Sequence, residues 1–200
     1  MLRMLLSVLL TLGLAQSQSD RGATPASSSL KPAYEIADAY DVYAAVLPKD
    51  WMLYGKPAKQ LIVQQETYPA KMCLEPEPES GKLIGEAIED YKKQNERMWF
   101  LQRKFKTDKP YVVLSSEAFM GKNQGRWEMP AYPDSGGYFL LSAVGFNSQR
   151  TVAVVWVEQR CGRLCGKGEF HVLQKTQNEW ATAEVARVVL QHRFLTETRR

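Results

Sequence analysis

The chain has 200 residues and a formal net charge of +4, with the positive excess spread along the sequence. A nucleic-acid-binding face needs concentrated lysine and arginine, so this distribution argues against a nucleic acid partner. The two short basic clusters, Arg103–Lys106 and Arg199–Arg200, are more typical of solvated surface. The length suits a single domain that buries a hydrophobic core of its own.

The first 17 residues have the pattern of a cleaved signal peptide. Arg3 supplies a positive charge, Met4 to Leu14 is almost unbroken apolar sequence, and Ala15 and Ser17 offer a cleavage site. The apolar run is shorter than the roughly 20 residues that span a bilayer, and no other run is longer. We therefore expect a protein secreted to the periplasm or the extracellular space that does not span the membrane. Without residues 1–17, the chain has 183 residues and a net charge of +3.

Residues 18–32 are rich in serine, glutamine, alanine, threonine and proline, a composition that predicts a flexible lead. Helical periodicity begins next. Apolar and aromatic residues recur at spacings of three and four from Tyr34 to Leu47, and Pro48 ends the run. This pattern predicts a helix over residues 34–47.

The middle of the chain alternates between strand and helix patterns. Residues 59–68 are β-branched in their centre, which predicts a strand. The alternating prolines within residues 75–81 exclude regular structure and predict a loop. Apolar residues at helical spacing then predict a helix over 84–99, and residues 110–115 again have the composition of a strand.

A glycine-rich and aromatic loop is expected from Met120 to Gly137. Trp127 and Tyr132 lie within it, and Tyr138 follows it directly. Aromatic side chains on a surface loop are typical of binding patches, so these three residues are candidate binding residues. The alternative is a loop that folds over the core and buries the same side chains.

Four strand-like segments follow in close succession, at residues 138–146, 151–158, 169–175 and 179–187. Links this short can join only antiparallel neighbours, because a parallel crossover needs a dozen or more residues. Residues 152–157 are apolar without alternation, which predicts a central strand covered on both faces.

These elements together predict an α+β fold. Residues 33–192 would form a single domain, followed by a charged tail over residues 193–200. We expect an antiparallel sheet of about five or six strands, with the two helices packed on one face. A cystatin-like or nuclear-transport-factor-like curved sheet is the nearest architecture.

Cys161 and Cys165 lie in the link between two of the expected strands, and a local disulfide is the leading expectation in an exported protein. A closure this short contributes about 2 kcal/mol in the chain-entropy model. The C-x3-C spacing argues against a redox-active dithiol, and with only His171 nearby a zinc site lacks ligands. The third thiol, Cys73, is expected to stay reduced, and its pairing with either other cysteine is the alternative.

One pattern resembles a known group of proteins. It consists of Val144-Gly145-Phe146-Asn147, an apolar strand, the cysteine and glycine run from Cys161 to Gly168, and Trp180. This order resembles a pattern in small exported bacterial proteins of unknown function, and it covers roughly residues 138–185, under a third of the chain. The resemblance implies export and a cysteine-bearing hairpin, and it implies no activity.

No catalytic, metal-binding or cofactor-binding motif is present, and the two histidines, His171 and His192, lie in different contexts. We therefore expect a non-enzymatic exported module that binds a partner protein, an envelope component or a small ligand. The alternative is an extracytoplasmic hydrolase whose acidic residues converge only in the fold. Two carboxylates, or a serine or cysteine with a histidine, in one concave pocket would favour the hydrolase.

Overall fold

A computed structural model describes residues 31–48, 52–53, 56–70, 81–123, 131–162 and 165–183. The predicted signal peptide, most of the predicted lead, Cys73, Trp127 and the predicted charged tail lie outside these residues. The described residues all belong to one compact unit that begins at Lys31.

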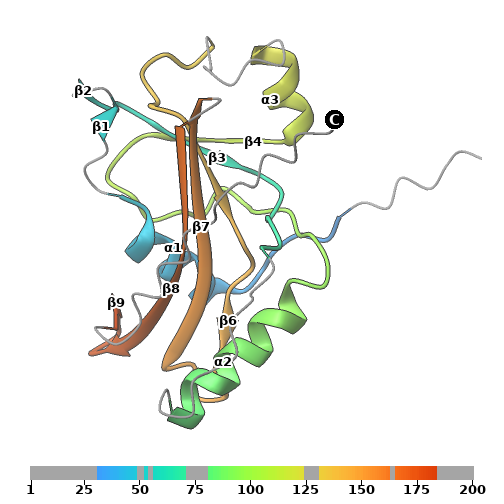
Figure 1. Cartoon of the computed structure of the whole chain (residues 1–200), viewed down its shortest axis with the longest axis vertical. Coiled ribbons are helices and arrows are strands. Elements are labelled where there is room, and N and C mark those ends of the chain that lie inside the picture. Colours follow the sequence, from blue (N-terminus) through green and yellow to red (C-terminus); the bar gives the residue numbers. More distant parts are fainter. Residues whose placement is uncertain are drawn as a thin grey trace, which may run out of the picture. The chain divides into compact units, whose positions relative to one another are not determined.

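Within this part of the chain there are three helices and nine strands (Figure 1). The helices are α1 (Ala37–Val46), α2 (Gly81–Gln94) and α3 (Ser116–Asn123). The strands are β1 (Met52–Leu53), β2 (Lys56–Pro57), β3 (Leu61–Gln64), β4 (Tyr111–Leu114), β5 (Tyr138–Leu141), β6 (Gly145–Phe146), β7 (Val152–Gly162), β8 (Cys165–Thr176) and β9 (Glu179–Thr182). None of the described helices is long and apolar enough to cross a membrane.

The main sheet has seven strands in the order β4-β3-β5-β7-β8-β9, with β6 also paired to β7. The predicted antiparallel meander of the C-terminal half is confirmed, because β5, β6 and β8 pair with β7, and β9 with β8, all antiparallel. A wholly antiparallel sheet is wrong, because β3 pairs in parallel with both β4 and β5. The links that hold α2 and α3 are long enough for parallel crossovers, unlike the short links of the meander.

The helices cover both faces of the sheet. Residues of α1 pack in one hydrophobic cluster with Ala153 and Val155, whereas residues of α2 pack in another with Val152, Val154 and Trp156. Successive residues of a strand point to opposite faces, so α1 and α2 lie on opposite sides of β7. The prediction of both helices on one face is therefore wrong. The prediction that this apolar strand is covered on both faces is confirmed.

The third helix, α3, was not expected from the sequence. It packs on the same face as α2, where its Phe119 joins a cluster with Tyr138 and Leu140 of β5. Ser115 caps it, because the hydroxyl of Ser115 accepts a hydrogen bond from the backbone N–H of Ala118 at 3.1 Å. A serine followed by an acidic residue in the first turn was the available signal.

The second helix ends five residues earlier than predicted, at Gln94. Two side chains donate hydrogen bonds to carbonyl groups of its last turn. The amide of Asn95 donates to the carbonyl of Tyr91 at 2.9 Å, and the indole of Trp99 donates to the carbonyl of Gln94 at 2.8 Å. These bonds close the helix at Gln94, and the chain then continues to β4.

Candidate functional site

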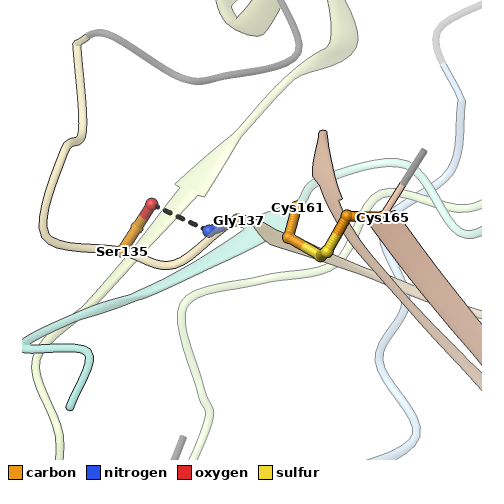
Figure 2. The surroundings of a disulfide bond; sticks show 4 residues. All are labelled: Ser135, Gly137, Cys161 and Cys165. Atoms are coloured by element: carbon orange, nitrogen blue, oxygen red, sulfur yellow. Dashed lines mark hydrogen bonds between the residues drawn. A yellow bond between two sulfur atoms is a disulfide. The ribbon is translucent and has the colours of Figure 1, made fainter. Parts of the chain in front are cut away.

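Cys161 and Cys165 are bonded as a disulfide at the end of the β7–β8 hairpin, with their Cα atoms 5.1 Å apart (Figure 2). This is the local bridge predicted from the sequence. The hairpin end packs against Gly137, whose φ is +117°. A Cβ at Gly137 would lie 2.2 Å from the carbonyl oxygen of Arg160 and 2.9 Å from the Cα of Cys161. The disulfide thus braces the hairpin where it contacts the turn before β5.

Replacing both bridged cysteines by serine is expected to lower the free energy of unfolding by about 2 kcal/mol, because the closed loop is short. Denaturant unfolding measures the loss. Reduction of the wild-type protein should give the same loss, which serves as the internal control. A stability that is unchanged in both experiments would contradict the bracing role.

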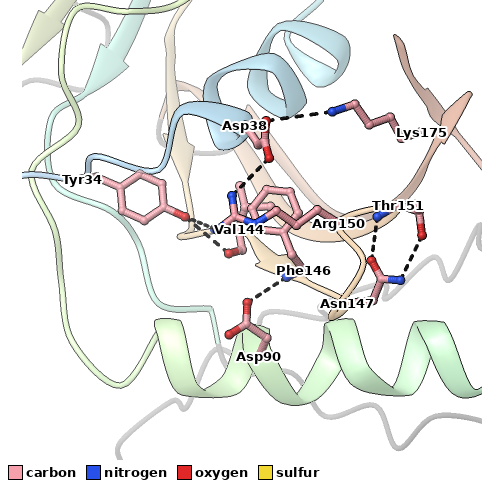
Figure 3. A network of polar contacts seen from close by, with 9 residues as sticks. All are labelled: Tyr34, Asp38, Asp90, Val144, Phe146, Asn147, Arg150, Thr151 and Lys175. Atoms are coloured by element: carbon pink, nitrogen blue, oxygen red, sulfur yellow. Dashed lines mark hydrogen bonds and ion pairs between the residues drawn. The ribbon is translucent and has the colours of Figure 1, made fainter. Parts of the chain in front are cut away.

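The pattern Val144-Gly145-Phe146-Asn147 lies where the strand begun by β5 is interrupted and resumes as β6 (Figure 3). Between β5 and β6, side chains form hydrogen bonds with the backbone N–H and C=O groups of Ala143 and Val144. The hydroxyl of Tyr34 accepts from the N–H of Val144 at 2.9 Å and donates to its carbonyl at 3.3 Å. Asn95 bonds both backbone groups of Ala143, at 2.9 and 3.0 Å.

The second half of the pattern contacts α2. A Cβ at Gly145 would lie 2.2 Å from the backbone nitrogen of Tyr91 and 2.4 Å from the carbonyl oxygen of Ala87, so only glycine allows this approach. The carboxylate of Asp90 accepts a hydrogen bond from the N–H of Phe146 at 2.8 Å (Figure 3). Gly145 and Phe146, two of the residues that carry the resemblance, therefore attach α2 to the sheet.

A groove of about 770 Å³ lies between α1, the coil of residues 106–109 and the β8–β9 turn. Phe105 anchors the coil to α1, because its ring centroid lies 5.5 Å from that of Tyr40. Gln177 and Asn178 have φ values of 49° and 70°, so β8 and β9 are joined by a two-residue turn with positive φ at both positions. Three segments that are distant in the sequence thus form the walls of the groove.

The groove has an apolar floor and a charged rim. The floor includes the buried side chains of Leu47 and Trp180. Three acidic and two basic side chains line the rest: Asp41, Asp108, Glu179, Lys106 and Lys109. The lining therefore carries an excess of one negative charge.

The charged groups of the groove differ in their contacts. Lys106 forms an ion pair with Asp41, and the ammonium of Lys109 lies 3.4 Å from the carbonyl oxygen of Ala58. Asp108 and Glu179 are exposed and have no ion-pair partner among the described residues. These two carboxylates are available to a ligand.

Trp180 is the aromatic element of the groove and is only 8% exposed. Its indole nitrogen is buried and has no hydrogen-bond partner within the described part of the chain. The ring lies 5.7 Å from the ring of Phe146, and the ammonium of Lys175 lies 5.4 Å from its centroid. The indole is thus fixed between α1 and the sheet, on the face opposite α2.

A second hollow, of about 230 Å³, lies between the first turn of α2 and the end of β8. Its lining is mainly apolar, with Leu83, Ile84 and Val172 among the contributors. It is smaller than the groove beside α1 and contains no carboxylate. The larger groove is the better candidate for a site that recognises a polar ligand.

His171 pairs with a carboxylate on its own strand, at 3.4 Å between its Nε2 and an oxygen of Glu169. Burial lowers the pKa of His171, and the nearby charge of Lys167 lowers it further, while Glu169 opposes the shift. Neither His171 nor Glu169 lines the groove. Across the described ranges, no three histidine, cysteine, aspartate or glutamate side chains form a group that could hold a metal ion.

The structure places two of the three predicted binding residues, Tyr132 and Tyr138, in packing positions. Tyr138 is 3% exposed and its ring centroid lies 4.5 Å from that of Phe119 in α3. Tyr132 is partly buried against the same cluster, and Trp127 lies outside the described residues. For Tyr132 and Tyr138, the structure matches the alternative of a segment folded over the core.

The groove was missed because its charges are ordinary in sequence. Asp41, Lys106 and Glu179 come from three segments, and each has the pattern of a solvated surface residue. The available signals were weak: two small residues, Ala44 and Ala45, on α1, and an aromatic residue, Trp180, two positions after a turn. Small side chains leave space beside a helix, and that space is part of the groove.

Comparison of the chain with protein-family models, with curated proteins and with solved structures found no match. The resemblance of residues 138–185 to exported bacterial proteins therefore stays a prediction. The candidate site is defined by its own geometry, as a charged groove with a tryptophan floor between α1 and the β8–β9 turn.

Proposed function

We propose that this chain is an exported binding protein whose ligand occupies the groove between α1 and the β8–β9 turn. The observation that carries the proposal is the groove itself, with a volume of about 770 Å³, a buried tryptophan and charges of both signs. Ligand sites commonly have volumes of about 300–1,000 Å³ and combine apolar surface with a few polar groups. Export rests on the predicted signal peptide and is supported by the Cys161–Cys165 disulfide.

The groove favours a small molecule that carries an amine beside an apolar group. Lys106 is already paired with Asp41, which leaves Asp108 and Glu179 to contact a ligand cation. The indole of Trp180 and the side chain of Leu47 offer apolar contact nearby. A ligand of this kind would match the negative excess of the lining.

Binding is favoured over hydrolysis by the surroundings of the groove carboxylates. Catalytic acids and bases are commonly held in buried, closely partnered positions, whereas Asp108 and Glu179 are exposed and no histidine is among the described residues that line the groove. His171 lies outside the groove, beside Glu169, and no hydrogen bond to it from a described serine or cysteine is present. The groove thus has contact groups for a ligand without an arranged acid and base.

The cystatin-like or nuclear-transport-factor-like arrangement is proposed only for α1 and the antiparallel strands β5, β7, β8 and β9. In those folds a helix packs against the face of a curved antiparallel sheet. The parallel pairings of β3 and the helices on the opposite face lie outside that arrangement.

Calorimetric titration with phenethylamine and with phenylacetate tests the proposal, because the two probes share a shape and differ in charge. We expect the amine to bind more tightly. Glu179→Lys should weaken amine binding about fivefold or more, since it replaces an attractive charge by a repulsive one. The matched control is Glu89→Lys, an exposed reversal on α2, which should leave binding unchanged.

Equal binding of both probes, or equal effects of the two variants, would contradict the groove as the site. Hydrolysis of a chromogenic ester, glycoside or phosphate that is lost in Asp41→Asn would replace the binding proposal by the hydrolase alternative.

A further inference from the structure

A second cavity, the hollow of about 230 Å³ at the first turn of α2, shares no described lining residue with the groove beside α1. Its described walls are the first turn of α2, Val152 at the start of β7, residues 172–174 of β8 and Ala183 after β9. An apolar cavity of about 150 Å³ takes up benzene, so this hollow has room for a slightly larger ligand.

The interior of the hollow is apolar. Val152 and Val172 are buried in the cluster that α2 forms with the sheet, and Ile84 packs against the same cluster. Leu83 also lines the hollow and is 39% exposed, which is unusual for a large hydrophobic side chain in the described part of the protein. An alkyl chain placed against these side chains would leave water, and the burial of each methylene group favours binding.

Charge at the edge of the hollow selects the head group of such a ligand. Among the described residues of the lining, Lys82 is the one charged residue, and none is acidic. The first turn of α2 also contains no acidic side chain. The ammonium of Lys82 lies 4.0 Å from a carboxylate oxygen of Glu86, and the lysine side chain is 89% exposed. A pair this long and this exposed contributes little.

Glu86 is held mainly by another residue. Its carboxylate accepts hydrogen bonds from the backbone N–H and the hydroxyl of Ser148, at 3.1 and 2.7 Å. These two bonds are the largest causes that lower the pKa of Glu86, and the charge of Lys82 contributes least. The ammonium of Lys82 is therefore available to a ligand carboxylate at the edge of the hollow.

We propose that this hollow binds a short-chain fatty acid anion, with its alkyl chain against Leu83, Val152 and Val172 and its carboxylate beside Lys82. A cationic ligand would be repelled by Lys82. A second copy of the chain would need about 800 Å² of contact surface on each partner, far more than a hollow of this size offers. The site is separate from the groove beside α1, so it does not depend on the function proposed for that groove.

Calorimetric titration with propanoate, butanoate, pentanoate and hexanoate tests the proposal. The affinity should rise about fourfold with each added methylene group until the hollow is filled. Lys82→Gln should weaken hexanoate binding about threefold and leave the binding of 1-hexanol, which has the same chain without the charge, unchanged. The matched control is Lys92→Gln, which removes another α2 lysine that pairs with a glutamate of the same helix and should change neither.

Ala183→Leu tests the location, because a leucine at this lining position would occupy the space of the alkyl chain. It should weaken the binding of hexanoate and of 1-hexanol more than tenfold. The matched control is Ala181→Leu, an exposed position of β9 that does not line the hollow, which should bind both as the wild type does. Circular dichroism confirms that each variant is folded.

Three results would overturn the proposal: an affinity independent of chain length, equal effects of Lys82→Gln and Lys92→Gln on hexanoate binding, or unchanged binding in Ala183→Leu. Sedimentation velocity adds a fourth. A dimer of the wild type that Ala183→Leu dissociates would assign the hollow to a second copy of the chain instead.

Discussion

Replacing Gly145 by alanine is expected to lower the free energy of unfolding by about 3 kcal/mol or more, or to prevent folding. The added Cβ would lie 2.2 Å from the backbone nitrogen of Tyr91 and 2.4 Å from the carbonyl oxygen of Ala87. Both atoms belong to the backbone of α2, which cannot yield as a flexible side chain would. Denaturant unfolding of the variant and the wild type measures the difference.

Gly85→Ala is the matched control, because it makes the same chemical change within α2. A Cβ at Gly85 meets no atom within 4 Å. Alanine is the better helix former by about 0.5–1 kcal/mol, so this variant should be slightly more stable than the wild type. If Gly145→Ala is tolerated as well as Gly85→Ala, α2 is not attached to the sheet at this point.

Raising the pH above about 10 is expected to unfold the protein in one cooperative step. Burial is the largest cause that raises the pKa of five tyrosines: Tyr34, Tyr40, Tyr43, Tyr91 and Tyr138. Their contribution to stability is fully present below the pKa of an unfolded tyrosine, near 10. Above it the unfolded chain releases protons that the folded chain retains, so stability falls as the pH rises.

Tyrosinate absorbance and far-ultraviolet circular dichroism, recorded on the same samples, measure this transition. The two signals should change together for the buried tyrosines. Tyr43→Phe should make the alkaline loss of stability shallower, at a cost at neutral pH of about 1 kcal/mol for the lost hydrogen bond to the carbonyl of Ser142. The control is Tyr68→Phe, which alters a 37% exposed residue. It should change neither the alkaline loss of stability nor the stability at neutral pH. Ionisation of all tyrosines in a protein that stays folded would contradict the buried network.

Link lengths explain which parts of the sheet could be predicted. The links on either side of β7 and β8 are too short for anything except antiparallel pairing, so the meander followed from the sequence. The links that contain α2 and α3 are long enough for either parallel or antiparallel pairing, and only packing decides between the two. The apolar run of β7 indicated burial on both faces, and such burial needs cover on each side, which the prediction of both helices on one face did not provide.

The candidate site was harder to predict than the fold, for a physical reason. The apolar positions of an element are periodic, whereas the groove is formed by Asp41, Asp108 and Glu179, which no local pattern connects. The most distinctive residues of the sequence have a different role. Gly145 lies against the backbone of α2, and Cys161 closes a hairpin, so these residues build the scaffold.

Chemical-shift mapping of the isotopically labelled protein with phenethylamine tests the central claim most directly, because it locates the ligand. The account predicts that the amide signals that move belong to Ala44, Thr107, Asn178 and Glu179, on the three walls of the groove. The same signals should stay in place with phenylacetate. Shifts confined to another part of the molecule, or an equal response to both probes, would contradict a ligand site between α1 and the β8–β9 turn.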